Sequence, residues 1–353
     1  MRLVTENPND ESSRARLGFS IRQFQRCMSR PTLPKMEFGP WCDASSVAPV
    51  ITVMCGGVGA ARFLRALSRH VDPREIRAVI NVGDDLVMHG LTICPDIDTI
   101  SYTLSGLNDD VRGWGLTDES WRVMQELGEL GGENWFSLGD RDLATHLYRS
   151  QRLHNGATKS EVTTEIACRR GIEIELLPAT DDPVATMLDS EVGELTFQEY
   201  FVKHHHGVAV HNVRYDGAER ATASVAAVEA IAKAERIIIA PSNPILSIAP
   251  MMAMAALREA LVARRDDVIA ISPFVGGAAL KGPADRLMKE LGYDATNAAV
   301  AQYYANYAGT LIIDEVDRSD DAAVRAVGLD VRVTTTVMSE PQQADALVRT
   351  ALA

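Results

Sequence analysis

Four aspartates lie within fifteen residues of this chain, between an apolar segment and the amphipathic segment that follows it. They are Asp84, Asp85, Asp96 and Asp98. A single aspartate often does no more than cap a helix or fix a turn beside a proline. Carboxylate oxygens are also the preferred ligands of Mg²⁺, and they can act as general bases. So dense a cluster favours a metal or a base for part of the group, and we expect two of the four to be structural.

A glycine-rich turn precedes this cluster. It contains Gly56, Gly57 and Gly59, and Arg62 follows three residues later. The pattern predicts a strand-to-helix turn whose free backbone N–H groups can hold a phosphate or a diphosphate. Tight turns of this kind also use glycine for backbone geometry alone. A phosphate-binding turn followed by oxygen ligands predicts magnesium-assisted chemistry on a nucleotide.

The same turn lacks the features of two other nucleotide sites. A nicotinamide site needs an acidic residue about twenty positions further on and a third glycine. This chain has Asn81 and Ala61 at those places. A P-loop needs a lysine in the pattern G-x-x-x-x-G-K-S/T, and the turn has none. An oxidoreductase that uses a nicotinamide cofactor is therefore the least favoured interpretation.

A third candidate is the segment 138–146, which reads LGDRDLATH. Arg141 is expected in the first turn of a helix, where the helix dipole disfavours a cation unless it has a partner. An arginine in such a position often contacts a ligand. Trp114, Trp121 and Trp135 lie nearby in the sequence. Exposed rings can stack on a planar heterocycle, although core packing explains each tryptophan equally well.

Two loops that follow later apolar segments contain small polar side chains. Ser242 and Asn243 lie between two prolines, and Ser272 begins a loop that also contains Lys281. These groups can recognise a base or a phosphate. They can equally belong to turns that proline makes rigid.

Short apolar segments alternate with amphipathic ones from residue 49 onward. This alternation predicts an α/β fold with a mainly parallel, doubly wound sheet that helices cover on both faces. The expected strands cover 50–55, 77–82, 172–177, 236–240, 268–271, 311–313 and 331–334, and the expected helices include 59–70, 117–130, 140–153, 221–234 and 250–264. Residues from about 181 to 216 read as extended pieces, at 196–202 and 208–213, and are expected to form an inserted subdomain. The candidate loops follow strands, so we expect them to meet at the carboxyl edge of the sheet.

The composition narrows the function further. The formal charge is −13 for the whole chain and −15 after the first 48 residues, so extended contact with nucleic acid is not expected. No apolar run reaches the roughly eighteen residues of a membrane span. The five cysteines show no zinc-binding spacing, and we expect a cytoplasmic protein. Residues 1–48 are rich in Arg, Ser, Asn and Pro, and we expect a weakly ordered extension before a domain at 49–353.

Several motifs occur in the same order and spacing as in one known family. They are GGVGAAR, NVGDD, CPDIDT, RGWG, LGDRDLATH, LPATDDPVAT, APSNP, and SPFVGG followed by KGPA. From Ile51 to the C-terminus the sequence resembles the 2-phospho-L-lactate transferases of coenzyme F420 biosynthesis, called CofD in archaea and FbiA in mycobacteria. The resemblance implies a Rossmann-like domain with an added subdomain, usually a homodimer, that acts on small-molecule substrates and requires a divalent metal.

The resemblance also implies a reaction and a set of residues. Members of the family transfer a phosphorylated three-carbon acid from a guanosine-diphospho donor to the terminal ribityl hydroxyl of the deazaflavin Fo, and GMP leaves. Asp98 and Arg141 fall on Fo-binding positions, and Asp98 would orient or deprotonate the hydroxyl. Mg²⁺ would be held by Asp98 first and by Asp96 second. The residues expected to hold the guanosine diphosphate are Gly56, Gly57, Gly59, Arg62, Ser242, Asn243, Ser272 and Lys281.

The sequence leaves two questions open. A non-catalytic regulator of the YvcK type, which binds nucleotide sugars, shares the glycine-rich opening of this fold, although the LGDRD and CPDIDT segments favour the enzyme. The second question is the three-carbon acid, which can be 2-phospholactate, phosphoenolpyruvate or 3-phosphoglycerate. One pocket contact worth roughly 1 to 3 kcal/mol can decide between groups that differ so little.

Overall fold

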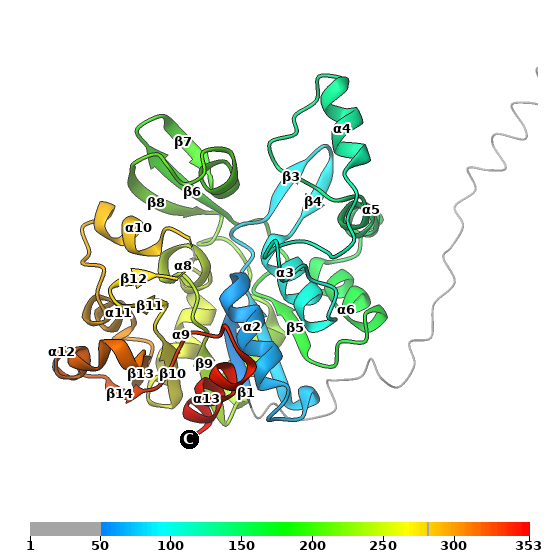
Figure 1. Cartoon of the computed structure of the whole chain (residues 1–353). Helices are drawn as coiled ribbons and strands as arrows, with labels where there is room; N and C mark the ends of the chain where they lie inside the picture. Colours follow the sequence, from blue (N-terminus) through cyan, green and yellow to red (C-terminus); the bar gives the residue numbers. More distant parts are fainter. Residues whose placement is uncertain (1–50, 281) are drawn as a thin grey trace, which may run out of the picture. The chain divides into compact units, whose positions relative to one another are not determined.

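The structure is a computed structural model that describes residues 51–280 and 282–353. The expected extension over residues 1–48 and the candidate Lys281 lie outside the described residues. A parallel sheet of seven strands forms the centre of the described part, in the order β14-β13-β10-β9-β1-β2-β5 (Figure 1). Its strands are β1 (Ile51–Cys55), β2 (Ile76–Ile80), β5 (Glu175–Pro178), β9 (Arg236–Ile239), β10 (Val268–Ile271), β13 (Thr310–Ile313) and β14 (Asp330–Val333). Every neighbouring pair is parallel, so the predicted doubly wound α/β, Rossmann-like fold is confirmed.

Helices connect the strands of this sheet. They are α2 (Gly57–Leu67), α3 (Pro95–Leu104), α4 (Arg122–Glu129), α5 (Asp140–His154), α6 (Lys159–Arg169), α7 (Val225–Lys233), α8 (Ala249–Met252), α9 (Ala255–Ala263), α10 (Ala284–Glu290), α11 (Asn297–Tyr304), α12 (Asp321–Ala326) and α13 (Pro341–Leu352). Most of these helices share one apolar core with the sheet, whereas α4 and α5 contribute to a second, smaller cluster. α2 packs against α3 and α13, and α7 packs against α9. Strands β1, β2 and β10 are buried along their whole length, as expected for strands covered on both faces.

The strand order changes direction beside β1. From β1 the chain adds β2 and β5 on one side, and it later adds β9, β10, β13 and β14 on the other. The boundary between β1 and β9 is therefore a topological switch point, where the carboxyl ends of neighbouring strands open a crevice for ligands. The glycine turn follows β1 and the Ser242 loop follows β9, so the fold brings these two candidates to the switch point.

The segment 181–216 contains a small antiparallel sheet of order β7-β6-β8. Its strands are β6 (Ala185–Ser190), β7 (Gly193–Thr196) and β8 (Val210–Asp216). β8 agrees with the extended piece expected at 208–213. The extended piece expected at 196–202 is wrong beyond Thr196, because the chain turns helical at Phe197 and Glu199–Lys203 forms a π-helical turn. The Glu199 carboxylate starts this turn by accepting a hydrogen bond from the Thr196 N–H at 3.0 Å.

The aspartate segment contains a hairpin that the sequence analysis did not predict. β3 (Leu86–Met88) and β4 (Leu91–Ile93) pair antiparallel across His89 and Gly90, whose φ angles are 53° and 75°. Two positive φ values at the centre of a two-residue turn are typical of type I′. The hairpin therefore folds the segment back on itself between Asp85 and α3.

The helix expected over 250–264 is broken in two. α8 ends at Met252 and α9 begins at Ala255, and Met254 between them is extended, with φ −82° and ψ 119°. Arg258 Nη1 donates to the Met252 carbonyl at 3.0 Å, which satisfies an acceptor that the break exposes.

No single helix within the described ranges is long and apolar enough to cross a membrane. The consecutive helices at 244–252 and 255–263 reach that length and composition only as a pair, and the pair bends by 96° at its break.

Candidate active site

The glycine turn is held in place by Asp96. Gly56 precedes α2 in an extended conformation, and Gly57 begins the helix with φ 76°. Asp96 Oδ1 accepts a hydrogen bond from the Gly57 N–H at 2.6 Å, and Oδ2 accepts one from Asn81 Nδ2 at 3.0 Å. A Cβ at Gly56 would lie 2.5 Å from Asp96 Oδ2, so this close approach requires glycine. The next two N–H groups of the first helical turn have no intrahelical acceptor.

The loop after β9 contacts the glycine turn directly. Ser242 Oγ donates to the Gly56 carbonyl at 2.8 Å, and a Cβ at Gly59 would lie 2.6 Å from the Pro241 carbonyl oxygen. Asn243 Oδ1 accepts two backbone N–H groups, at 3.0 and 3.1 Å, and thereby caps the turn that follows it. The structure brings the two predicted loops together, and their polar side chains support the backbone there.

Ser272, which follows β10, is also engaged within the protein. Its buried hydroxyl donates to Asn297 Oδ1 at 2.6 Å and accepts from the Phe274 N–H at 3.2 Å. Asn297 Nδ2 in turn donates to Asp320 Oδ2 at 3.0 Å. Contact between these side chains and a nucleotide stays a prediction, and Lys281, expected in the same loop, lies outside the described residues.

Asp84 and Asp85 each keep one buried carboxylate oxygen, Oδ1, without a hydrogen-bond partner. Asp85 Oδ2 forms an ion pair with Lys159 Nζ at 2.5 Å. Burial and the neighbouring charges of Asp96 and Asp85 raise the pKa of Asp84 well above its ordinary value. Burial also raises the pKa of Asp96 to about 6, although its two hydrogen bonds oppose the shift. Two buried carboxyl groups whose charged form is disfavoured by burial therefore lie near the glycine turn.

Asp98 lies in the first turn of α3 and is paired with Arg149 on α5. Asp98 Oδ2 accepts from Arg149 Nη1 at 3.0 Å, and Asp98 Oδ1 accepts from Nη2. Asp98 is 4% exposed and Arg149 is 1% exposed, so water has almost no access to this pair. Burial alone would lower the pKa of Arg149, but the Asp98 charge outweighs it and raises that pKa. The roles predicted for Asp98 stay predictions, and the structure adds that its charge is balanced.

Arg141 lies at the exposed N-terminal end of α5. Its guanidinium donates to the Thr117 carbonyl, and its backbone N–H donates to Glu119 Oε2 at 2.8 Å. The loop that precedes α4 therefore supplies the acceptors that offset the unfavourable position of the Arg141 cation at the start of the helix. The interactions of the described residues join Asp98 to Arg149 rather than to Arg141.

The sequence analysis missed Arg149 and the polar helix face to which it belongs. His146 is buried, its Nε2 lies 3.1 Å from Asp142 Oδ1, and its Nδ1 lies 3.3 Å from Arg149 Nη1. The Tyr102 hydroxyl also donates to Asp142 Oδ1. The three α5 residues follow one another at intervals of four and three, which places them on one face of the helix. The spacing of Asp142, His146 and Arg149 in the sequence was the signal that could have revealed this polar helix face.

The carboxylates at the glycine turn fit a cation better than Asp98 does. Asp84 offers an unpartnered oxygen, and Asp96 is close enough to raise its pKa, whereas both Asp98 oxygens already face Arg149. Within residues 51–280 and 282–353 no three His, Cys, Asp or Glu side chains form a metal-binding group. Mg²⁺ nevertheless often takes one or two carboxylates and completes its shell with water and substrate phosphates.

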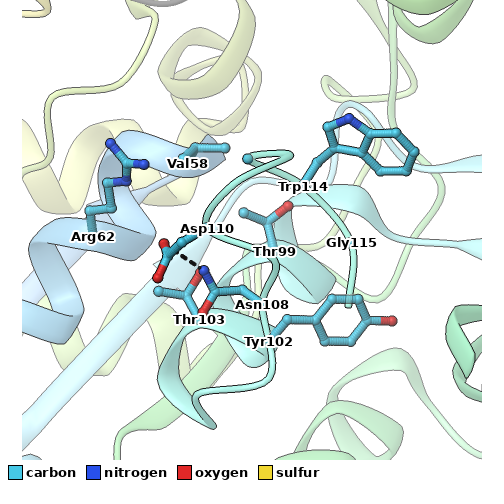
Figure 2. A pocket seen from close by; sticks show the side chains of 10 residues that line it. Val58, Arg62, Thr99, Tyr102, Thr103, Asn108, Asp110, Trp114 and Gly115 are labelled. Atoms are coloured by element: carbon cyan, nitrogen blue, oxygen red, sulfur yellow. Dashed lines mark hydrogen bonds between the residues drawn. The ribbon is translucent and has the colours of Figure 1, made fainter. Parts of the chain in front are cut away.

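A pocket lies between α2, α3 and the loop that follows α3 (Figure 2). Its lining residues are Val58, Arg62, Thr99, Tyr102, Thr103, Asn108, Asp110, Gly113, Trp114 and Gly115. Figure 2 shows Arg62 and Trp114 on opposite sides of this pocket. In the part of the chain that the structure describes, Arg62 has no hydrogen-bond or ion-pair partner, so a half-buried cation is available next to the glycine turn.

Comparisons with known proteins place the chain in a family. Residues 51–341 match the family model described as 2-phospho-L-lactate transferase CofD. A phosphoenolpyruvate transferase from Mycolicibacterium smegmatis is 40% identical over 320 residues, which cover 86% of this chain and 97% of the relative. A phosphoenolpyruvate transferase from Kitasatospora aureofaciens is 41% identical over 313 residues, with coverage of 86% and 97%.

A solved structure supports the fold independently. A crystal structure of a member of the UPF0052 family from Bacillus halodurans has a TM-score of 0.60 at 17% identity, and the match covers 87% of this chain and 99% of that chain. At that identity the likeness concerns the fold alone. On the strength of the family model and the relatives, the chain belongs to the 2-phospho-L-lactate transferase CofD family and is a transferase with a phosphotransfer role in coenzyme F420 biosynthesis.

Proposed function

We propose that this chain transfers an enolpyruvyl phosphate group from a guanosine-diphospho donor to the ribityl hydroxyl of Fo, and that GMP leaves. The observation that carries the proposal is the meeting of this family's motif-bearing loops after β1 and β9, at the switch point of the sheet. The choice of the enolpyruvyl group rests on relatives at about 40% identity, which are phosphoenolpyruvate transferases. The 2-phospholactyl and phosphoglyceryl groups are the competing donors in the test.

The donor's diphosphate fits the N-terminal end of α2. The backbone N–H groups and the dipole of a helix both favour an anion at this end. Asp96 uses the Gly57 N–H, which leaves the following N–H groups of the turn for a ligand. Arg62, one helical turn further on, adds a cation without a described partner.

We propose Asp84 and Asp96 as the residues that would hold Mg²⁺. Lys159 compensates Asp85 through their ion pair, so among the described residues no cationic side chain contacts Asp84 or Asp96 directly. When bound there, the metal would neutralise charge on the phosphate oxygens of the donor. The metal ligands expected from the sequence are Asp98 and Asp96. We keep Asp96 and put Asp84 in the place of Asp98.

The acceptor hydroxyl is proposed to be oriented by Asp98. Because Arg149 balances the charge of Asp98, the carboxylate is suited to accept a hydrogen bond from the hydroxyl and to hold it in line. The hydroxyl oxygen attacks the phosphorus that carries the three-carbon acid, its proton passes to Asp98, and the new P–O bond forms as the bond to GMP breaks. The protein then contributes alignment and charge neutralisation, with no covalent intermediate.

The test is a donor competition with the full chain, Fo and Mg²⁺. GMP release is followed by chromatography, and the deazaflavin product is identified by mass spectrometry. We expect Fo-dependent GMP release that is fastest with the enolpyruvyl donor. Release that does not depend on Fo, or the absence of a deazaflavin product, would contradict the function, whereas faster turnover of another donor would correct the acid alone. The expected homodimer also stays a prediction, which light scattering of the same preparation can check.

A further inference from the structure

Trp114 is a large aromatic side chain that stays exposed beside the pocket of Figure 2. It is 44% exposed and lines that pocket opposite Arg62. Aromatic side chains contribute most to stability when they are buried. An indole left in solvent at the edge of a pocket therefore needs another explanation.

The loop around Trp114 holds the exposed ring in a fixed position. The Arg112 guanidinium carbon lies 4.8 Å from the ring centre of Trp114 and 5.1 Å from that of Trp121, and the two indoles meet edge to face at 5.8 Å. Arg112 also donates to the carbonyls of Trp114 and Leu116, at 3.1 and 2.6 Å. Asp109 accepts the Arg112 N–H at 2.8 Å. These contacts order the ring before any ligand arrives, which reduces the entropy lost on binding.

The pocket beside this ring borders both parts of the proposed active site. Two residues of α3 line it. Thr99 follows Asp98 directly, and Tyr102 lies one helical turn after Asp98. Val58 and Arg62 line it from the first turns of α2, next to the glycine turn. A planar ring stacked on the indole at the mouth of this pocket would therefore lie between the Asp98 side and the glycine-turn side.

We propose that Trp114 is the stacking surface for the planar heterocycle of a substrate. The inference rests on the proposed function, in which the deazaflavin of Fo and the guanine of the donor both have such a ring. The position of Thr99 and Tyr102 beside Asp98 favours the deazaflavin. Stacking of a ring on a fixed indole strengthens binding by about tenfold or more.

The test measures binding without turnover, so that it does not depend on the chemical step. Trp114→Ala removes the ring, Trp114→Phe keeps a smaller one, and Val111→Ala is the matched control, because Val111 is fully exposed in the same loop and outside the pocket lining. Calorimetry gives the dissociation constant of Fo alone and, separately, of GMP with Mg²⁺. Circular dichroism confirms that each variant folds.

We expect the dissociation constant of Fo to rise by about tenfold or more in Trp114→Ala, to recover largely in Trp114→Phe, and to stay unchanged in Val111→Ala. A rise for GMP in place of Fo would support the stacking surface and assign it to guanine. Unchanged constants for both ligands in Trp114→Ala would overturn the proposal. If the wild-type chain binds Fo and GMP but forms no deazaflavin product, the proposed function fails while the binding measurements still decide the role of Trp114.

Discussion

Asp98 and Asp84 are both buried carboxylates of one short segment, but within the described part of the chain only Asp98 has a cation directly against it. Arg149 contacts both oxygens of Asp98, and both residues are almost fully removed from water. Asp84 keeps one buried oxygen without a partner, and its pKa is raised by burial and by Asp96 and Asp85. A buried ion pair and a buried unpaired charge have opposite consequences when they are mutated.

This contrast suggests different uses for the two ends of the segment. A compensated carboxylate is stable without a ligand and can position a substrate. An uncompensated carboxylate lowers the stability of the empty protein and gains from a bound cation, as strained or unsatisfied groups at functional sites often do.

The largest effect is expected for Asp84→Asn, which removes an unbalanced charge from the proposed metal site. Fo-dependent GMP release should fall by about 100-fold or more, because neutralisation of the phosphate oxygens is lost. The unfolding free energy of the metal-free protein should not fall, since the substitution relieves a desolvated charge. Single-turnover kinetics and urea unfolding measure the two quantities. A variant with normal turnover would show that Asp84 is only a structural residue.

Arg149→Met should destabilise the protein by about 3 to 5 kcal/mol, because it leaves the Asp98 charge buried and unpaired. Adding Asp98→Asn in the same chain should restore part of that loss. Arg152→Met, three residues further along the same helix at a more exposed position, is the matched control. Arg152 pairs with Glu165 where water reaches both side chains, so about 1 kcal/mol or less is expected. If urea unfolding showed the same loss of unfolding free energy for both arginine variants, the buried Asp98–Arg149 pair would be no more important for stability than the more exposed pair.

The raised pKa of Asp96 predicts a pH dependence of stability in the metal-free protein. Its folded-state pKa of about 6 lies above the ordinary value of 3.8. The folded state therefore binds the proton more tightly, and the resulting stabilisation, present at low pH, is lost as the pH rises through about 6. Relative to Asp96→Asn, the wild-type chain should lose on the order of 2 kcal/mol between pH 4.5 and 7.5. Urea unfolding with a chelator measures this, and parallel pH profiles of the two proteins would refute it.

The smallest effect is expected for Ser242→Ala, which removes the hydrogen bond to the Gly56 carbonyl. Loss of this buried contact should cost about 1 kcal/mol of unfolding free energy. Ser137→Ala, at an exposed position, should change stability by no more than about 0.5 kcal/mol. A Ser242 variant as stable as this control would show that the two loops do not depend on that bond.

Local patterns predicted much of the fold because they depend on neighbours in the sequence. The strand at 268–271 is β10, and the helix expected over 140–153 is α5 with one residue added. Thr158 and Glu161, three positions apart, form a capping box at the start of α6, a pattern that is readable from neighbours in the sequence. Loops that follow buried strands also met at the expected edge of the sheet, since parallel strands align their carboxyl ends.

The electrostatics of the site were not predictable in the same way, because the partners are distant in the sequence. Arg149 is 51 positions from Asp98, and Lys159 is 74 positions from Asp85. Composition gives no signal for such pairs until the fold brings α5 and α6 against the aspartate segment. The turn at His89 was missed for a local reason, because histidine adopts positive φ less often than asparagine or glycine.

The β3–β4 hairpin has a practical consequence for experiments on this enzyme. Its base is held by the Asp85 ion pair with Lys159, and its turn residues His89 and Gly90 are exposed although Met88 beside them is buried. Exposed tips of this kind tolerate substitution and insertion. A spectroscopic label can therefore be introduced at the exposed turn while leaving the carboxylates at the base undisturbed.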